Sequence, residues 1–429
     1  MSSSSIPPGY AAVTRLAGWA APALAPFSSK VREGLALRAR SAEEWTAWCG
    51  TARDPRRPLL LLHAASAGEL RQAEPVLARL RRGHPDWQLV VSSTSPSTAH
   101  VVPSLPIDLG VTLPWDTPSE TRTFIEALAP TALVFSHLDL WPALVAAAVA
   151  RGTRLGVIAA RVRGDSSRLA WPARQVFRST YASLELIGAI DADDAERLIR
   201  LGVLAGRIRV LGDPRFDSVV ERTAGRPAPR PHPTTLVAGS TWPDEERILL
   251  ATLGSLHHAQ VPARLVLAPH RPGAETAHRI AALARRVGLA PPRDLHSASD
   301  QDSLVVVNEL GRLADLYGEG VIAYVGGGFR RGGLHSVLES AVWGVPTITG
   351  PEVQGFPEAL LLRDQGALMT LPRRGAATTL EAWWETWLTN TEAREEAGRT
   401  ARRTVREYTG AAERCARLIE DLMPGPTSG

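Results

Sequence analysis

Short apolar runs alternate with segments of helical periodicity along most of this chain. Residues 58–63 (PLLLLH) form an almost unbroken apolar run, which is typical of a strand buried on both faces of a sheet. Apolar side chains then recur every three or four residues from Leu70 to Leu80, which predicts a helix. The strands expected in the first half of the chain are residues 58–63, 88–91, 110–113, 131–135, 155–159, 184–190 and 207–211.

A proline-rich segment divides this pattern in two. Residues 222–233 carry four prolines, a density typical of a stiff, extended linker. The alternation then resumes, and the last part of the chain is mostly helical. Strands alternating with helices predict two doubly wound α/β domains, with ligands at the carboxyl ends of parallel strands. The strands expected after the linker are residues 235–238, 264–267, 303–307, 321–325 and 347–348.

The N-terminal segment is the most apolar part of the chain. Arg15, Pro22 and Pro26 interrupt residues 10–27, and no positive charge precedes them, so neither a membrane-spanning helix nor a signal peptide is expected. Basic residues follow from Lys30 onward, which leaves two interpretations: an anchor lying in a membrane surface, or a terminal helix packed on the protein. The side chains that could share one helix face are Tyr10, Val13, Leu16, Trp19, Ala20 and Leu24.

Composition narrows the possible functions. A chain of 429 residues exceeds the roughly 250–300 residues that one hydrophobic core supports, so two domains are expected. Lys30 is the only lysine, which excludes a phosphate-loop lysine or a Schiff-base lysine elsewhere in the chain. Cys49 and Cys415 lack the spacing of a zinc site or a disulfide scaffold. The net charge of +4 without a long basic run does not indicate nucleic-acid binding, but it suits anionic substrates or an anionic membrane.

Two loops of the first domain carry carboxylates. His63-Ala-Ala-Ser-Ala-Gly-Glu69 follows the first strand, and a carboxylate there could act as a general base. The alternative is that Glu69 only caps the following helix, where its charge suits the helix dipole. Asp139, before Leu-Trp-Pro142, offers the same choice between a site residue and an N-cap.

Three loops of the second domain are suited to anions. Residues 239–246 (GSTWPDEE) open its first helix, and residues 268–272 (APHRP) add His270 and Arg271. Residues 325–333 (VGGGFRRGG) lead into an expected helix with His335, Ser336 and Glu339. The glycine spacing is not the dinucleotide fingerprint, but free backbone N–H groups and two arginines predict an anion site. Glu339 could accept hydrogen bonds from a ribose or simply face solvent. Together the loops predict a nucleotide here and the acceptor in the first domain.

The order of these motifs resembles one family. HAASAGE, LDLWP, GDPRFD, GSTWPDEE, APH, ELGRLADLY, the AYVGGGF…HSVLESAVWGVP region and GPEVQGFPEA occur in the sequence order of the 3-deoxy-D-manno-octulosonic acid (Kdo) transferases of lipopolysaccharide synthesis. The resemblance extends from about residue 30 to about residue 367. It implies a GT-B fold, in which two Rossmann-like domains face a cleft.

The resemblance also implies an activity and a location. Family members transfer Kdo from CMP-Kdo to a hydroxyl of a lipid A precursor, with inversion and without a protein-bound metal or other cofactor, at the cytoplasmic face of the inner membrane. The implied domains are a membrane-associating segment (1–30), an acceptor-binding domain (31–221), the linker (222–233) and a CMP-sugar-binding domain (234–429).

Individual roles follow from matching motif positions. Glu69 would be the general base, with Asp139 as the second catalytic candidate, and Ser66, Gly68 and Arg161 would face the acceptor. The residues implied for CMP binding are Ser240, Thr241, His270, Arg271, Gly326, Gly327, Gly328, His335, Ser336 and Glu339.

Some positions depart from the family pattern. Asp139 stands where a glutamate is common, Ser336 replaces an asparagine, and the asparagine two residues before Arg161 is lost. These departures concern substrate recognition more than the reaction class. The alternatives are a GT-B transferase or epimerase with a different nucleotide sugar, and a catalytically silent binding relative.

Overall fold

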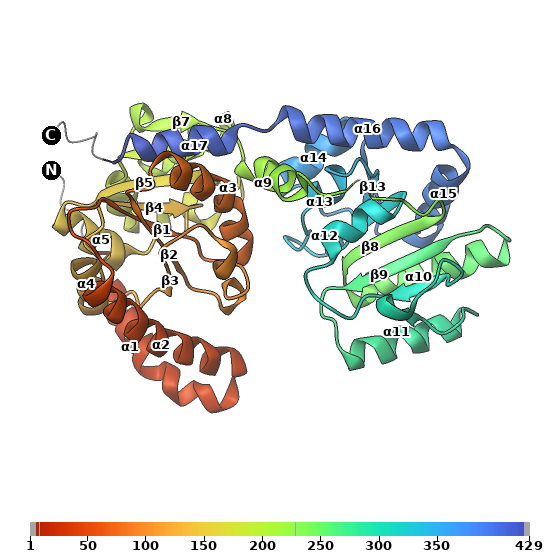
Figure 1. Ribbon diagram of the computed structural model, residues 1–429, viewed down its shortest axis with the longest axis horizontal. Helices are drawn as coiled ribbons and strands as arrows, with labels where there is room; N and C mark the ends of the chain where they lie inside the picture. Colours follow the sequence, from red (N-terminus) through yellow and green to blue (C-terminus); the bar gives the residue numbers. More distant parts are fainter. Residues whose placement is uncertain (1–5, 8, 228, 424–429) are drawn as a thin grey trace. The chain divides into compact units, whose positions relative to one another are not determined.

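The chain divides into two compact units. A computed structural model describes residues 6–7, 9–227 and 229–423. The described residues up to Ser218 and those from Tyr408 onward form the first unit, and Val219–Glu407 form the second. Each unit contains a seven-stranded sheet whose strand pairs are all parallel (Figure 1). This confirms the expected pair of doubly wound α/β domains.

The sheet of the first unit has the strand order β3-β2-β1-β4-β5-β6-β7. Its strands are β1 (Leu59–His63), β2 (Gln88–Ser93), β3 (Leu109–Thr112), β4 (Ala132–Ser136), β5 (Arg154–Ala160), β6 (Leu186–Ala189) and β7 (Ile208–Val210). Its helices are α1 (Tyr10–Leu24), α2 (Ser29–Thr51), α3 (Ala67–Gly83), α4 (Pro118–Leu128), α5 (Pro142–Arg151), α6 (Ala173–Val176), α7 (Arg178–Ala182), α8 (Ala192–Leu201) and α17 (Ala411–Glu420); α9 (Pro214–Thr223) crosses into the second unit.

The central strand β1 is apolar on both faces because helices cover both sides of the sheet. Leu59 and Leu61 pack with Phe124 of α4 and Leu144 of α5. The intervening leucines of β1 pack on the opposite side, with α3 and α17. Since helices exclude water from both faces, the unbroken apolar run that predicted this strand has a direct physical cause.

The sheet of the second unit has the order β10-β11-β9-β8-β12-β13-β14. Its strands are β8 (Thr235–Thr241), β9 (Arg264–Pro269), β10 (Arg293–Asp294), β11 (Leu304–Val306), β12 (Ile322–Val325), β13 (Thr347–Thr349) and β14 (Leu368–Thr370). Its helices are α10 (Pro243–His258), α11 (Ala274–Arg286), α12 (Leu313–Leu316), α13 (Leu338–Ala341), α14 (Pro357–Asp364), α15 (Ala376–Thr389) and α16 (Thr391–Glu407). The strands β10 and β14 were not expected from the sequence.

The C-terminal helix corrects the expected domain boundary at 234–429. Instead of completing the second domain, α17 lies against α3 of the first unit (Figure 1). The Asp217 carboxylate accepts hydrogen bonds from the backbone N–H groups of Gly410 and Ala412, at 2.8 and 3.2 Å. Cys415 and Ile419 are buried in the same core cluster as β1. Residues 424–429 of the expected domain lie outside the described residues.

The proline-rich segment 222–233 also differs from a free linker. Its first residues complete α9, and the described remainder packs on the second unit. Arg226 forms an ion pair with Asp315, and the backbone N–H of His232 donates to the carbonyl oxygen of Glu319 at 2.8 Å. Ala228 lies outside the described residues. The prolines therefore stiffen a strap on the surface of the second unit.

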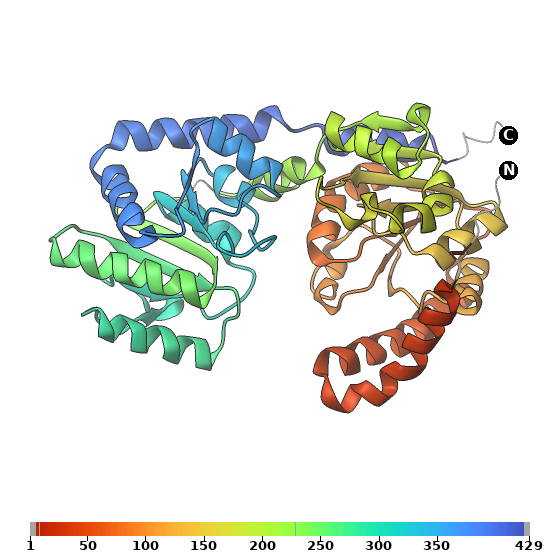
Figure 2. The ribbon, with the colours of Figure 1, turned by 180° about the vertical axis from the view of Figure 1, so that it is seen from behind.

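The N-terminal segment forms α1, the short 3₁₀ helix η1 (Ala25–Phe27) and α2, which extend from the first unit as a helical hairpin (Figure 2). The Tyr10 hydroxyl donates to the Asp116 carboxylate at 2.7 Å, which fastens the start of α1. Large apolar side chains further along α1 and η1 face water. Of the helices in the described ranges, none is long and apolar enough to cross a bilayer. Residues 1–5 and 8 of the expected segment 1–30 lie outside the described residues.

Candidate active site

The loop after β1 holds Glu69 in the first turn of α3. Ser66 is the N-cap residue, and its hydroxyl oxygen accepts from the Glu69 backbone N–H at 3.4 Å. The Glu69 carboxylate accepts from the Ala65 backbone N–H at 2.7 Å and from the Ser66 hydroxyl at 3.2 Å. Glu69 therefore makes the contacts of a helix cap. The carboxylate also lies near the carboxyl end of β1, a central strand, which is where ligands bind in such sheets. The cap contacts and the general-base role are therefore compatible.

Burial and a neighbouring carboxylate raise the pKa of Glu69. Desolvation is the larger cause, and the negative charge of Asp139 adds to it, while the Ala65 N–H and the charge of Arg168 oppose the shift. Asp139 lies in the loop after β4, the strand next to β1, so the two carboxylates meet at one sheet edge. The structure thus brings together the two predicted catalytic candidates.

Asp139 is not the N-cap of α5, so that alternative is wrong. Trp141 occupies the N-cap position. The Asp116 carboxylate accepts from the backbone N–H groups of Ala143 and Leu144, at 3.0 and 2.8 Å. Burial raises the pKa of Asp139, and Arg168, 3.9 Å away, opposes this shift. Because another residue caps α5, Asp139 remains available for a function at the sheet edge.

A buried histidine fixes the loop that carries Asp139. The Trp141 indole N–H donates to His63 Nε2 at 3.1 Å, and His63 Nδ1 lies 3.0 Å from the Ser92 hydroxyl. Since Nε2 accepts a hydrogen bond, the ring is neutral with its proton on Nδ1. Burial lowers the pKa of His63 to about 3. His63 and Trp141 stand in separate motifs of the sequence, and their contact becomes evident only in three dimensions.

The three predicted acceptor residues have different surroundings. The Ser66 hydroxyl is occupied by the cap. Gly68 is exposed, and an added Cβ would meet only the Ser66 side chain, at 3.9 Å, so close packing does not require a glycine here. Arg161 directly follows β5, and its charge acts on His137, where it adds to the lowering of the pKa by burial, and on Asp194, where it opposes the raising of the pKa by burial. Arg161 therefore lies on the same side of the sheet as the carboxylates.

In the second unit, the glycine-rich loop requires its glycines for close packing. A Cβ on Gly326 would lie 2.3 Å from the Ser240 carbonyl oxygen. On Gly327, which has φ of 87°, it would lie 1.9 Å from the Gly333 carbonyl oxygen. On Gly328 it would lie 2.4 Å from the Gly350 nitrogen. The loop after β12 is therefore in direct backbone contact with the end of β8 and with the loop after β13, which only glycine permits.

Two of the N–H groups expected to be free in this loop are already hydrogen-bonded within the protein. The backbone N–H of Gly326 donates to the Gly239 carbonyl oxygen at 2.9 Å. The N–H of Gly327 donates to both carboxylate oxygens of Glu245, at 2.8 and 3.0 Å. Glu245 also accepts from the backbone N–H of Trp242 at 3.0 Å. A carboxylate of the protein itself thus occupies part of the expected anion site, and its burial raises its pKa.

Aromatic and basic side chains gather beside this loop. His270 stacks on Trp242 with ring centroids 4.3 Å apart, and His335 lies 4.9 Å from His270. The guanidinium of Arg330 lies 4.0 Å from the centre of the Trp242 ring, and that of Arg271 lies 5.9 Å away. We call these five residues the Trp242 cluster. Trp242 and Arg330 were not among the predicted binding residues, although they stand in residues 239–246 and 325–333, two of the loops predicted to bind anions.

Both histidines of the cluster are neutral at physiological pH. Burial lowers the pKa of His335 to about 4, and the neighbouring His270 adds to this shift. Burial also lowers the pKa of His270, and the charges of Arg271 and Arg330 reinforce the effect. The arginines therefore supply the positive charge of the cluster, while the histidines offer neutral hydrogen-bonding nitrogens.

Of the other residues predicted to bind the nucleotide, several lie outside the Trp242 cluster or differ from their expected placement. His335 and Ser336 precede α13 instead of lying on it, because the His335 N–H is tied to the Gly326 carbonyl oxygen at 3.2 Å. Glu339, in the first turn of α13, pairs with Arg222 at 3.1 Å, so it is not a solvated, unpaired carboxylate. The buried Thr241 hydroxyl has no hydrogen-bond partner among the described residues. Ser240 has φ of 55°, a strained conformation at the end of β8.

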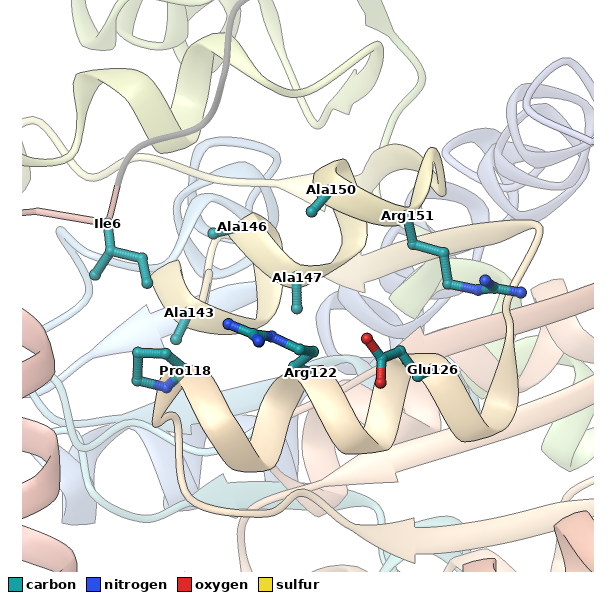
Figure 3. A pocket seen from close by; sticks show the side chains of 9 residues that line it. All are labelled: Ile6, Pro118, Arg122, Glu126, Ala143, Ala146, Ala147, Ala150 and Arg151. Atoms are coloured by element: carbon teal, nitrogen blue, oxygen red, sulfur yellow. The ribbon is translucent and has the colours of Figure 1, made fainter.

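A cavity of about 490 Å³ lies elsewhere in the first unit, between α4 and α5 (Figure 3). Alanines of α5 line one side of it, and Pro118, Arg122 and Glu126 of α4 line the other (Figure 3). It contains none of the predicted site residues. The carboxylates and the Trp242 cluster are therefore better candidates for chemistry than this cavity.

Comparisons with known proteins agree with the motifs. Residues 39–218 match the family model described as 3-deoxy-D-manno-octulosonic-acid transferase (kdotransferase). A Kdo transferase of Bordetella pertussis is 28% identical over 84% of this chain and 87% of its own length. One from Haemophilus influenzae is 25% identical over 90% of this chain and 92% of its own length. The chain is related to the Kdo transferases.

Solved structures share the fold of this Kdo transferase relative. A UDP-GlcNAc 2-epimerase of Neisseria meningitidis, bound to UDP-GlcNAc, superposes with a TM-score of 0.60 at 13% identity, over 85% of this chain and all of the other. A glycosyltransferase of Rickettsia africae gives 0.57 at 12% identity, over 85% of this chain and 98% of the other. These similarities confirm the GT-B fold and carry no information about the substrate.

Proposed function

We propose that this protein transfers Kdo from CMP-Kdo to a hydroxyl group of a lipid A precursor of the lipid IVA type. The observation that carries the proposal is the pair of half-buried carboxylates, Glu69 and Asp139, at the carboxyl edge of the first sheet. The relationship to Kdo transferases supports the choice of the transferred sugar. The Trp242 cluster supports an anionic donor in the second unit.

In the proposed reaction, Glu69 takes the proton of the acceptor hydroxyl. The acceptor oxygen attacks the anomeric carbon of Kdo on the face opposite CMP, the bond from that carbon to the phosphate oxygen breaks, and the electron pair leaves with CMP. One displacement inverts the anomeric centre. The raised pKa of Glu69 makes the carboxylate a stronger base than an exposed glutamate, which favours proton transfer.

The proposed donor site uses side chains to bind the phosphate. Arg271 and Arg330 supply two positive charges, and His270 and His335 supply neutral ring nitrogens beside them. The unpartnered hydroxyl of Thr241 would gain a hydrogen bond from the bound nucleotide. Positive charge at the leaving phosphate stabilises the negative charge that develops there, so no metal ion is required by this proposal.

The proposed location is the cytoplasmic face of the inner membrane. On α1 and η1, Val13, Leu16 and Trp19 are 66%, 63% and 81% exposed, and Phe27 is 88% exposed. Tyr10, expected on the same face, instead turns inward to Asp116. An exposed apolar helix face followed by basic residues suits binding in the headgroup region of a bilayer.

Mass spectrometry of the product tests this function directly. The full-length protein is incubated with CMP-Kdo and a tetraacylated lipid A precursor, and the acceptor is expected to gain the mass of Kdo. Release of CMP without a mass gain would indicate hydrolysis, and no reaction would favour a silent binding protein. Thermal stabilisation by UDP but not by CMP would favour a transferase or epimerase with a different nucleotide sugar.

A further inference from the structure

An arginine-rich segment, residues 161–178, leads from the carboxylate edge to the surface of the first unit. It begins where β5 ends, contains the 3₁₀ helix η4 (Ser167–Leu169) and α6, and ends at the start of α7. Arg168 of this segment is the residue 3.9 Å from Asp139. The segment is therefore in contact with the proposed base site at one point. We call it the arginine segment.

The charge of the arginine segment is strongly one-sided. It holds five arginines and a single acidic residue, Asp165, so its excess of four positive charges equals the formal net charge of the whole chain. Arg163 pairs with Asp165 at 3.0 Å. Arg174 and Arg178 are exposed, and no described carboxylate lies within 4.0 Å of either. These two positive charges are available to an anionic partner.

The same segment exposes apolar surface. Trp171 is 80% exposed and Val176 is 37% exposed. A single exposed apolar side chain is common on any protein surface. Here, however, an indole and a branched side chain lie among exposed arginines, and an indole beside basic groups is the combination found at bilayer interfaces.

The arginine segment adjoins the N-terminal hairpin. The rings of Phe177 and Tyr10 meet edge to face, with centroids 6.4 Å apart. Tyr10 is the first residue of α1, whose other large apolar side chains face water. Two elements of the same unit that expose apolar side chains are therefore joined by a direct contact, and the arginine segment also contacts Asp139 through Arg168.

We propose that the arginine segment is a second membrane-contact element, which binds an anionic phospholipid surface together with α1. Trp171 lies at the level of the headgroups, and Arg174 and Arg178 bind lipid phosphates. Because Arg168 reaches Asp139, this contact places the carboxylate edge at the bilayer surface, where an amphiphilic acceptor is present. The role of the acceptor rests on the proposed function, whereas the membrane contact does not.

Vesicle flotation of the full-length protein tests the contact. The vesicles contain phosphatidylcholine alone or phosphatidylcholine mixed with phosphatidylglycerol. The R174Q/R178Q variant is expected to lose about fivefold in affinity for the anionic vesicles per arginine, and to bind neutral vesicles unchanged. The W171S variant is expected to bind both vesicle types more weakly. The control variants, R122Q/R151Q and L204S, change other exposed residues of the same unit and are expected to bind like the wild type.

Two results would overturn the proposal. The first is that R174Q/R178Q and W171S bind vesicles as tightly as the wild type does, or that the control variants lose as much binding as they do. The second is tight binding of a short RNA that depends on the same residues, which would indicate a nucleic-acid surface.

A turnover measurement separates this proposal from the proposed function. With CMP-Kdo, the KM for vesicle-embedded acceptor is expected to rise in R174Q/R178Q while turnover of detergent-dispersed acceptor is unchanged. Loss of both would assign the arginines to the acceptor site and contradict a membrane role. If the wild type shows no transfer at all, the proposed function fails, and the flotation result still decides the membrane contact.

Discussion

Replacing Glu69 with glutamine separates the two roles that this residue can have. Glutamine keeps the size of the side chain and one carbonyl oxygen, so it can still accept from the Ala65 N–H. It cannot take a proton. If Glu69 is the base, kcat falls by about 10²–10⁴-fold, which corresponds to roughly 3–5 kcal/mol of activation free energy. If it is only a cap, the loss is about 0.3–1 kcal/mol of folding stability with kcat nearly intact.

The first unit contains a matched control for the cap. At the start of α4, the Glu120 carboxylate accepts from the Trp115 N–H at 3.2 Å and from the Thr117 hydroxyl at 3.3 Å, as Glu69 does at the start of α3. Glu120 is exposed and follows the edge strand β3. The E120Q variant is therefore expected to lose a similar amount of stability without losing activity.

The pH dependence of kcat/KM gives a second measurement of the same base. The carboxylate must be ionised to take a proton, so activity is lost as pH falls through the pKa of Glu69. Because burial raises this pKa, the acid limb should lie above the range of an exposed glutamate. D139N removes a negative neighbour and should move the limb to lower pH. R168Q removes a positive neighbour and should move it to higher pH.

These assays can refute the reasoning. Turnover is measured from CMP release with saturating substrates, and stability is measured from denaturant unfolding. If E69Q retains near-normal kcat and loses the same stability as E120Q, Glu69 is a helix cap, and Asp139 is the next candidate for the base. If the acid limb is unchanged in both D139N and R168Q, Glu69 does not titrate in the rate-determining step.

Three further predictions concern positions outside the reacting carboxylate. E245Q, which weakens the charge-assisted bonds to the Gly327 N–H, should destabilise the protein by about 1–3 kcal/mol and raise the KM for CMP-Kdo; an unchanged donor KM in initial-rate measurements would contradict this positioning role. Y10F removes the hydrogen bond to Asp116, so limited proteolysis should cut α1 faster than in the wild type, and equal rates would show that apolar packing alone holds the helix. The pKa of His63 is about 3 in the folded protein, against an ordinary value of 6.5, so the unfolded chain binds the proton first as the pH falls. The contribution of His63 to stability is therefore complete above pH 6.5 and is lost as the pH falls toward 3. In H63Q, the free energy of unfolding should fall less steeply with decreasing pH over this range.

The alternation of elements could be predicted because both sheets are covered on both faces. Buried parallel strands are continuous apolar runs, and their helices have one apolar face, so the two periods are distinct in the sequence. The missed strands, Arg293–Asp294 and Leu368–Thr370, lie at the two edges of the second sheet and are only two and three residues long. Unlike the equally short inner strands β11 and β13, which are fully buried, these edge strands are exposed or only partly buried and do not form an apolar run. The placement of α17 was missed for a different reason, since its apolar face does not specify which core it joins.

The site could be predicted only where one motif supplies both the residue and its surroundings. Glu69 was found because the small residues before it and its position after a strand are local features. The opposite case is Asp139, whose cap alternative could be rejected only because Asp116, far away in the sequence, occupies the start of α5. Likewise, the contact between His63 and Trp141 joins two motifs that are separate in the sequence.

The glycine-rich loop shows why a motif can indicate close packing without indicating the ligand. Its glycines permit backbone contact with the end of β8 and with the loop after β13, and a nearby carboxylate, Glu245, accepts from the Gly327 N–H that an external anion could otherwise use. The proposed donor site therefore relies on side chains as well as on this loop to meet the negative charge of the donor. In the second unit, Arg271 and Arg330 both lie within 6 Å of the ring of Trp242, which also stacks on His270. Because Glu245 also accepts from the backbone N–H of Trp242, one buried carboxylate ties the glycine-rich loop to the backbone of the residue on whose ring these side chains gather.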